Sequence, residues 1–478
     1  MKFAGSRTKN AAYGKQKANR ISLVSMPSPS QPAEELFATV IEEKFAFLHI
    51  DLNSFFASVE QQLHPEYRNR PLAVVPTLAD TTCCIAASYE AKALGIKTGT
   101  QVGEAKRICP DIVLVHGNHN EYAEHSRRIA EAVDLVCPVA HTPSIDEMVC
   151  QLLGRECEPH RARQIALAIK QSIYKNVGDT LRCSIGMAPN RYLAKVASDM
   201  QKPNGLIGLL PSQLPRAIEH IELRDLPGVG ARMEKNLAAK GITTMQQLLD
   251  LDRNGMHALF NSVWGDRMYH WLRGHQTGED HDSNNFSGSE IQKSLGHSHV
   301  LAPEHRTPEG SWAVAHKLLH KAAMRLRMEK FYCGSLSVTI RFALTREQAA
   351  RAQKSKKHFS GINHQGWGLE ARFAPCQDTL TLLEVLRDAW AQRPQDEFCS
   401  RPFFVGVTLS RLIHEDEHQQ SLFANLGHRD ELSHTMDKLN LKYGHSTLHF
   451  AGMLPARESA PTRIAFTQIP VKYGVDYM

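Results

Sequence analysis

The sequence contains a short apolar run that ends on an acid. Residues 45–50 read Phe-Ala-Phe-Leu-His-Ile, and Asp51 follows. This run is too short to cross a membrane and is bounded by charge, which is typical of a buried strand. Two further acids, Asp146 and Glu147, follow the segment 142–145. The sequence therefore predicts a strand with Asp51 at its exit, and the three acids indicate a divalent-metal site.

Magnesium is the ion that suits such a set of acids. Hard Mg²⁺ prefers carboxylate oxygens together with phosphates, and two such ions can clamp the attacking and leaving oxygens of a phosphoryl transfer. The alternative is that each acid is a solvated strand end. Because successive strand residues point to opposite faces, Asp146 and Glu147 can share a metal only if the chain bends. Pro143 and Ser144 favour such a bend.

Composition sets broad limits. A chain of 478 residues with 42% hydrophobic content is expected to form several domains with buried cores. Its formal net charge of +6 is compatible with a polyanionic partner and also with many ordinary enzymes. The ten cysteines lack paired Cys-x-x-Cys spacing, so we expect reduced thiols and no zinc site. No apolar run is long enough to span a bilayer, which predicts a soluble, cytoplasmic protein.

Several short blocks follow one another along the chain. They are Asp51–Glu60, Ala87–Lys97, Ser144–Glu147, Cys183–Lys195 and Ala197–Gly205. Their order and spacing resemble those of the Y-family translesion DNA polymerases, in particular the bacterial DNA polymerase IV-like enzymes of the impB/mucB/samB family. The resemblance extends over about residues 45–455. Any one block would be a weak signal, whereas the ordered set is a strong one.

This resemblance implies an α/β multidomain fold with right-hand polymerase architecture. Its parts are an α+β palm, small fingers, a helical thumb and a βαββαβ little finger. The expected ranges are a disordered basic N-terminal arm at 1–44, palm at 45–75 and 118–210, fingers at 76–117, thumb at 211–275, a linker at 276–290, little finger at 291–413, and a C-terminal tail at 414–478.

The resemblance also implies roles for the acids. Asp51 and Asp146 are expected to bridge two Mg²⁺ ions, and Glu147 to complete the ion that activates the primer 3′-hydroxyl. The carbonyl of Leu52 is expected to help hold the ion bound to the nucleotide. The implied reaction is nucleotidyl transfer, which depends mainly on positioning and electrostatics.

The incoming nucleotide has expected contacts of its own. By the same resemblance, Tyr89, Lys92 and Lys202 occupy triphosphate positions, and Phe55 and Phe56 are nucleotide-binding. Phe56 stands at the steric-gate position, where an aromatic ring leaves no room for a 2′-hydroxyl. Its alternative is ordinary core packing. Lys92 replaces an arginine common in the family, which gives up bidentate phosphate geometry but keeps the charge.

Two positions depart from the family pattern. Asn53 replaces an acid that is not a metal ligand in the family, so activity is not threatened. Met148 stands where a small residue is usual. It could crowd the floor of the site or only repack its neighbours, and the sequence leaves both open.

Other segments predict contacts with DNA and a partner protein. The Gly-rich hairpin at Gly228, Val229 and Gly230 resembles a helix-hairpin-helix that offers backbone N–H groups to a phosphate, the alternative being a plain Pro-Gly turn. A basic loop is also expected to contact phosphate, unless it is a solvated charge run. Its lysines are Lys354, Lys356 and Lys357.

The run 419–423, Gln-Gln-Ser-Leu-Phe, resembles the peptide that binds a β-type sliding clamp. Gln419, Leu422 and Phe423 would be its contacts, with the two apolar side chains filling a pocket. The alternative is a buried helical edge. This motif, together with the fold, predicts a partner beyond the DNA substrate.

Together these features predict a low-fidelity, template-directed DNA polymerase for translesion synthesis. Its expected partners are primer-template DNA, deoxynucleoside triphosphates (dNTPs) and the clamp, and we expect a nucleoid-associated monomer. A catalytically silent scaffold that binds DNA or clamp is the alternative, but all three carboxylates are present. A nuclease using the same metals lacks support once the Phe56 and Lys202 blocks are counted.

Overall fold

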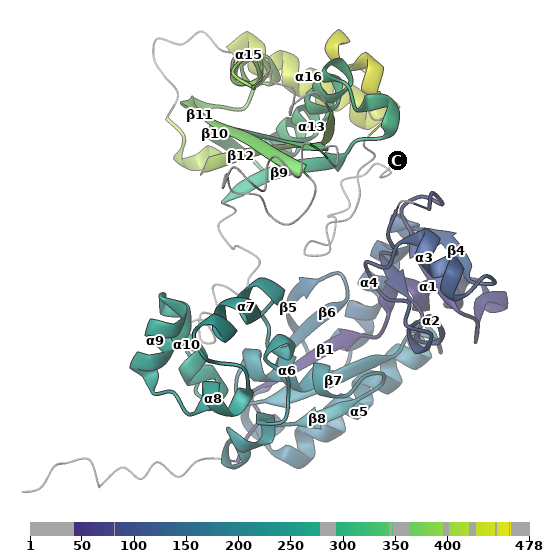
Figure 1. The fold of residues 1–478 in the computed structure, drawn as a ribbon, viewed down its shortest axis with the longest axis vertical. Helices are drawn as coiled ribbons and strands as arrows, with labels where there is room; N and C mark the ends of the chain where they lie inside the picture. The colour runs from purple at the N-terminus through teal and green to yellow at the C-terminus, as the bar shows by residue number, and fades with distance from the viewer. Residues whose placement is uncertain are drawn as a thin grey trace, which may run out of the picture. The chain divides into compact units, whose positions relative to one another are not determined.

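The computed structural model describes residues 43–80, 82–277, 293–343, 347, 364–394, 401–419, 427–444, 447–457 and 459. Several predicted segments therefore fall outside the described residues: nearly all of the N-terminal arm, the linker from residue 278 on, and the loop with Lys354, Lys356 and Lys357. The described parts are mixed α/β, as predicted (Figure 1).

The palm is built on an antiparallel sheet with one parallel edge. Within the described residues the strand order is β5-β6-β1-β7-β8, and β8 pairs parallel to β7. The strands are β1 (Phe47–Leu52), β5 (Val139–Ser144), β6 (Glu147–Gln151), β7 (Cys183–Ala188) and β8 (Leu206–Gly208). The strand predicted over residues 45–51 is observed as β1, the central strand, which begins at Phe47 and ends at Leu52, and all residues of β1 are buried.

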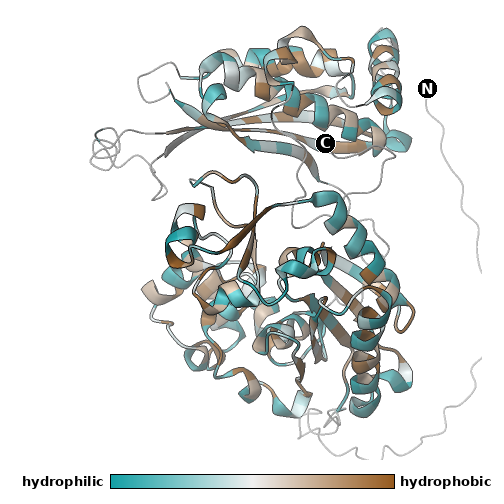
Figure 2. Ribbon diagram, turned by 90° about the vertical axis from the view of Figure 1, so that its right-hand side faces the viewer, coloured by the Kyte–Doolittle hydropathy of each residue, from teal (hydrophilic) through white to brown (hydrophobic). Residues whose placement is uncertain are grey.

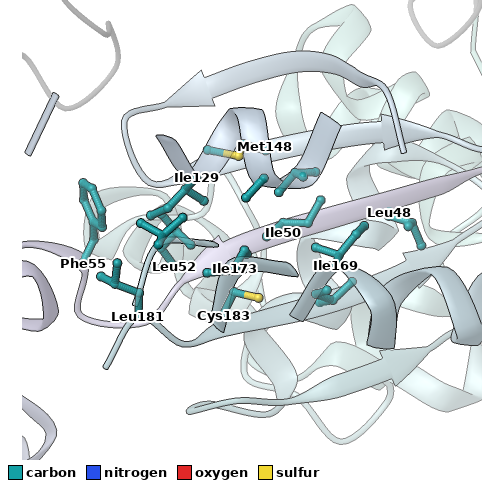
Figure 3. Close-up of a cluster of buried hydrophobic side chains, with 14 of the residues drawn as sticks. Leu48, Ile50, Leu52, Phe55, Ile129, Met148, Ile169, Ile173, Leu181 and Cys183 are labelled. Carbon is teal, nitrogen blue, oxygen red and sulfur yellow. The ribbon is translucent and has the colours of Figure 1, made fainter. Parts of the chain in front are cut away.

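Helices cover both faces of this sheet. On one face, α4 (His119–Asp134) and α5 (Pro159–Asn176) pack their apolar residues against Leu48, Ile50 and neighbours, as Figure 3 shows. On the other face lies α6 (Arg191–Met200). It crosses β7 at Gly186, where a Cβ would come within 2.0 Å of the Ala194 carbonyl oxygen. Only glycine permits this close approach of helix to strand.

The fingers have a small sheet of their own. It consists of β2 (Leu72–Val75), β3 (Ala86–Ala87) and β4 (Val113–His116), in the order β3-β2-β4. Helices α2 (Tyr89–Ala93) and α3 (Val102–Ile108) complete it, and α1 (Phe55–Leu63) links it to β1. The assignment of strand 71–75 to the palm is therefore wrong. Its residues pair with strands of the fingers, because Leu72 to Val75 align with Val113 to His116.

The predicted all-helical thumb is observed. Its helices are α7 (Ala231–Ala239), α8 (Met245–Leu249), α9 (Arg253–Phe260) and α10 (Val263–Leu272). Short 3-10 turns precede them at Pro211–Gln213, Arg216–Ile218 and Leu223–Asp225. Buried apolar residues of these helices share one core cluster with α6, including Leu193, Leu237 and Met268.

The little finger shows the predicted βαββαβ order. Its elements are β9 (Ser294–Val300), α13 (Pro308–Met328), β10 (Phe331–Ala343), β11 (His364–Cys376), α15 (Thr379–Ala391) and β12 (Pro402–His414). The strands pair antiparallel in the order β11-β10-β12-β9. Both helices pack on one face of this sheet and share its apolar core, and Figure 2 shows hydrophobic residues in the helices and strands of this domain.

The segment after residue 414 is more structured than the predicted tail. This segment contains helix α16 (Gly427–Tyr443) and a 3-10 helix, η9 (Ala451–Ala456). Arg327 on α13 forms a buried ion pair with Asp437 on α16, with nitrogen–oxygen distances of 2.6 and 2.9 Å. Ala456 of η9 joins the little-finger core. The tail prediction was wrong for these residues because they pack on the distant helices α13 and α15, and the ion pair of Arg327 with Asp437 joins residues 110 positions apart.

Among the described residues, no helix combines the length and apolarity needed to cross a bilayer.

Candidate active site

The predicted acids meet at one end of the palm sheet. Asp51 near the end of β1 lies directly opposite Glu147 at the start of β6. The backbone N–H of Leu52 donates to the carbonyl of Asp146 at 2.9 Å. Strand pairing therefore brings together carboxylates that are almost a hundred residues apart in sequence.

The bend that both acids require is a tight hairpin. Ser144 pairs with Glu147, so Ile145 and Asp146 form a two-residue turn between β5 and β6. Asp146 is thus in the turn and Glu147 in the strand, and the alternation of a straight strand does not apply to them. The bend lies after Pro143 and Ser144 rather than at them. Ser144 contributes instead through its hydroxyl, which donates to Asp146 Oδ1 at 2.6 Å.

The acids have unequal electrostatic environments. Burial raises the pKa of Asp146, and the nearby charges of Asp51 and Glu147 raise it further. Burial alone would do the same to Asp51, but the ammonium groups of Lys195 and Lys202 outweigh it and lower the pKa of Asp51. The two aspartates therefore differ in proton affinity because cations contact only one of them closely.

Lysines neutralise this acid cluster. Lys195 Nζ lies 2.6 Å from Asp51 and 2.5 Å from Glu147, and Lys202 Nζ lies 2.6 Å from the other oxygen of Asp51. Asp199 contacts both lysines, at 3.2 and 2.8 Å. Although burial alone would lower the pKa of Lys195, Asp51 and the other acids raise it. The lysines therefore stay charged.

These residues fit a divalent-metal site. Carboxylate oxygens from Asp51, Asp146 and Glu147 are the hard donors that Mg²⁺ prefers. Lys195 Nζ already places a positive charge between Asp51 and Glu147, which shows that the cluster accommodates a cation. In the part of the chain that the structure describes, no three acid, histidine or cysteine side chains form a ready metal cage. The acids are arranged around lysine ammonium groups.

The predicted triphosphate residues gather next to the acids. Lys92 Nζ donates to the Ser54 hydroxyl at 2.7 Å and lies 4.5 Å from the centre of the Tyr89 ring. Burial and then the charge of Lys202 lower the pKa of Lys92, so the two ammonium groups are neighbours. Ser54 has a left-handed backbone, with φ of 50°, which costs a non-glycine residue about 1 kcal/mol or more. The fold thus brings Tyr89, Lys92 and Lys202 together.

Asn53 connects the strands and the loop that carry the acids and Lys202. Its amide nitrogen donates to the Ser184 hydroxyl at 3.1 Å, and its oxygen accepts from the Asn204 N–H at 2.7 Å. An amide can donate and accept at once, whereas an ionised acid only accepts. Asn53 therefore ties β1 to β7 and to the loop that carries Lys202. Lys170 holds the same loop through the carbonyl of Asn204 at 3.0 Å.

Met148 does not enter the site. It pairs with Ile50, is fully buried and lies in the cluster beneath the sheet, as Figure 3 shows. Glu147 next to it points to the opposite face. Of the two readings left open by the sequence, repacking of neighbours is the observed one.

The two phenylalanines are buried at the start of α1. Phe55 is 3% exposed and Phe56 is 5% exposed, and their ring centres lie 5.7 Å apart. The Phe56 ring stacks on Tyr122 of α4 at 4.3 Å. Both belong to the palm core, and both begin the helix that follows the strand of Asp51. The core reading and the nucleotide reading are therefore compatible for Phe56.

The thumb hairpin has the expected turn geometry. Gly228 has φ of +88°, where a side chain would be strained and would clash with Trp264. The side chain of Val229 is buried, and its N–H donates to the Leu226 carbonyl at 2.9 Å. Val229 thus anchors the hairpin internally. At Gly230 a Cβ would meet nothing within 4 Å, so its backbone is open on that side.

The predicted clamp motif is only partly described. Gln419 is exposed just after the 3-10 turn Glu415–Glu417, whereas Leu422 and Phe423 lie outside the described residues.

Comparison with known proteins identifies the family of this chain. The model of the impB/mucB/samB family matches residues 50–199, and that of the family's C-terminal domain matches 292–422. A model described as the DNA polymerase-iota thumb domain matches 224–276. DNA polymerase IV of Moorella thermoacetica is 31% identical over 415 residues, which cover 86% of this chain and 97% of that protein. The chain belongs to the impB/mucB/samB family of Y-family DNA polymerases.

Other relatives agree with the assignment. DNA polymerase IV 1 of Bacillus subtilis is 29% identical over 440 residues, which cover 88% of this chain and 96% of the relative. Among solved structures, a Y-family DNA polymerase chimera of Dbh and Dpo4 superposes with a TM-score of 0.59 at 21% identity. It covers 77% of this chain and 99% of its own length, which supports the same right-hand fold.

Sequence reasoning missed Lys195 and Asp199 in this family member. Lys195 and Asp199 are spaced i and i+4, which places them on one face of α6, and Lys202 follows in the next loop. That spacing, on a helix directly after a buried strand, is the signal that could have found them. Ser144 also had no predicted role in the site beyond the bend.

We expect Lys195→Met to lower the melting temperature of the metal-free protein and to increase the rise in melting temperature that Mg²⁺ causes. Without this ammonium group, Asp51 and Glu147 repel each other, at a cost of about 1–3 kcal/mol for a partly exposed cluster. Added Mg²⁺ should then raise the melting temperature of the variant more than that of the wild type, because Lys195 no longer competes for the acids. Scanning calorimetry with and without Mg²⁺ measures both effects.

Lys235→Met, on the exposed side of α7, is the matched control because it removes an equal charge far from the acids in sequence. Equal Mg²⁺-induced shifts for Lys195→Met, Lys235→Met and the wild type would contradict the idea that Lys195 competes with the metal.

Proposed function

We infer that this chain is a DNA-directed DNA polymerase of the translesion class, which adds dNTPs to a primer 3′-hydroxyl. One observation carries this inference: three carboxylates converge at a strand end beside the cations Lys92 and Lys202, of which Lys202 contacts Asp51 directly. Acids that hold metal and cations that hold phosphates are the two parts that nucleotidyl transfer needs. The relatives named DNA polymerase IV support the same activity.

We propose that Asp51, Asp146, Glu147 and the carbonyl of Leu52 hold two Mg²⁺ ions. When bound, these ions would lower the pKa of the primer 3′-hydroxyl and offset the charge of the triphosphate. The protein's own contribution is the rigid placement of the acids. The β1–β6 pairing fixes Asp51 against Glu147, and the Ser144 hydroxyl orients Asp146.

Tyr89, Lys92 and Lys202 are proposed to bind the triphosphate. In this structure Lys202 contacts Asp51 and Asp199, and its long side chain can turn from these acids to a phosphate. Lys92 is already held near Tyr89 by the Ser54 hydroxyl. Both ammonium groups offer a point charge without the fixed fork of an arginine. The Phe56 ring is proposed to select deoxyribose.

DNA contacts are proposed for three surfaces. The hairpin of Gly228, Val229 and Gly230, whose backbone is open at Gly230, can approach a phosphate without reading bases. A pocket beside the acids is lined by His49, Pro143, Val149, Arg191, Tyr192, Lys195, Trp271 and Thr277. Its cations, Arg191 and Lys195, suit the phosphate backbone of the primer strand. Burial lowers the pKa of His49 to about 3, so this ring adds no charge to the pocket. The lysines of the loop at 354–357 would add further phosphate contacts.

A catalytically silent scaffold of the same fold is not favoured. Such a protein would have no need to retain all the acids, and here Asp51, Asp146 and Glu147 are present and adjacent.

Asp146→Asn is expected to abolish primer extension while leaving DNA binding intact. The substitution keeps the size of the side chain but removes the charge that would hold both ions. Extension of a labelled primer with Mg²⁺ and single dNTPs measures activity, and a gel shift measures binding. Activity within about tenfold of wild type would refute the metal role, since loss of a transition-state charge contact costs far more.

Phe56→Ala is expected to raise incorporation of ribonucleotides relative to deoxynucleotides. Removing the ring opens the space where a 2′-hydroxyl would fit. The ratio of kcat/KM for a dNTP and the matching ribonucleotide measures the effect, which we expect to reach about tenfold or more, as when a shape constraint is lost. An unchanged ratio would return Phe56 to core packing alone.

The double substitution of Leu422 and Phe423 by Ala is expected to reduce processivity on clamp-loaded templates only. We propose that these residues tether the enzyme to a β-type clamp, which raises its effective concentration at the primer end. Primer extension with and without clamp separates the outcomes. Equal processivity with clamp would refute the tether, and lost clamp-free activity would show a structural role instead.

A further inference from the structure

Tyr122 lies directly behind the ring of Phe56. The two ring centres are 4.3 Å apart and the planes differ by 13°, so the rings are stacked. Phe56 belongs to α1 and Tyr122 to α4, and Tyr122 is fully buried. The edge of His119 meets both rings, at 6.5 Å from Phe56 and 6.0 Å from Tyr122. Phe56 therefore rests on a wall of other rings.

A hydrogen bond fixes the Tyr122 ring. Its hydroxyl donates to Glu60 Oε1 at 2.5 Å, and the Glu60 side chain is itself buried. Burial and the bond to Glu60 raise the pKa of Tyr122, which keeps the hydroxyl protonated as a donor. Glu60 follows Phe56 by four residues on α1, so it lies one helical turn away on the same face. Helix α1 thus carries both the Phe56 ring and the anchor of its support.

This arrangement costs more than plain core packing would. Burying a carboxylate such as that of Glu60 is unfavourable unless it is hydrogen-bonded. A phenylalanine at position 122 would fill the same space and would not require a buried carboxylate as its partner. The phenol and carboxylate together supply a fixed orientation, because one ring face is held against Phe56 while its far end is bonded to α1. The gain is rigidity at this ring.

We propose that Tyr122, anchored by Glu60, is a positioning residue that holds the Phe56 ring and thereby sets discrimination between deoxyribose and ribose. This inference rests on the proposed role of Phe56 as a steric gate. A ring excludes one additional oxygen only if it cannot retreat, and a displacement of about 1 Å is enough to change rates strongly. The terminal torsion of a phenylalanine is soft, so the stiffness has to come from what lies behind it.

The first test replaces the supporting ring. Tyr122→Leu removes the flat surface, and Tyr122→Met fills a similar volume with a flexible chain and serves if the leucine variant folds poorly. Each should lower the ratio of kcat/KM for a dNTP to that for the matching ribonucleotide by about fivefold or more. Tyr122→Phe keeps the ring and should lower it less. The ratio is informative because a loss of folded enzyme reduces both rates equally.

Val133→Ala is the matched control. Val133 is also buried on α4 and in the same core, but it lies eleven residues, or about 16 Å, along the helix from Tyr122. It should lower the melting temperature without changing the nucleotide ratio. A ratio within twofold of wild type for both Tyr122→Leu and Tyr122→Met would overturn the proposal.

A double substitution tests whether Tyr122 acts through Phe56. In a Phe56→Ala background, Tyr122→Leu should change the ratio by less than about twofold, because the ring that it supports is gone. An undiminished effect in that background would overturn the proposal. If Phe56→Ala alone leaves the ratio unchanged, both the gate role of Phe56 and the positioning role of Tyr122 are refuted. If Phe56→Ala lowers the ratio and Tyr122→Leu does not, only the positioning role of Tyr122 is refuted.

Discussion

The register between β1 and β6 is the constraint on which the site depends. Because the side chains of a strand alternate, the pairing of Asp51 with Glu147 places both acids on the face covered by α6 and sends Ile50 and Met148 to the opposite core. A slip of one residue would exchange these sets, placing the acids in the apolar core and the apolar side chains against the charged residues of α6. The hydrophobic core beneath the sheet therefore also fixes the catalytic geometry. Stability and site are specified by the same alternation.

Helix α6 and the loop after it supply the cations that offset the carboxylates at the end of β1. Its close crossing at Gly186 brings Lys195 and Asp199 over the acids, and the loop that follows supplies Lys202. Asn53 then ties this loop back to β1. A cluster of carboxylates without such cations would repel itself and take up protons. The lysines lower the pKa of Asp51 and hold Asp51 and Glu147 close together, which leaves these carboxylates ready for a divalent cation that competes for the same oxygens.

Features that depend on local sequence could be predicted, whereas features that depend on distant contacts could not. The apolar run before Asp51 predicted β1, and the family resemblance predicted the βαββαβ order of the little finger. The family blocks identified the acids. The pairing of β2 with β4, the docking of α16 through Arg327 and the role of Lys195 were missed, because each depends on a partner far away along the chain. The periodicity of hydrophobic residues predicts a helix or a strand, but it does not predict which other helix or strand packs against it.

Phe56 shows why a core reading and a functional reading need not compete. A residue that excludes a substrate atom by its bulk has to resist displacement, and in a protein that resistance comes from close packing. The burial that made Phe56 look like an ordinary core residue is therefore a physical requirement of the proposed gate. Its stack on Tyr122 and the bond from Tyr122 to Glu60 carry that stiffness into α1 and α4. Specificity at the nucleotide then depends on side chains that never touch it.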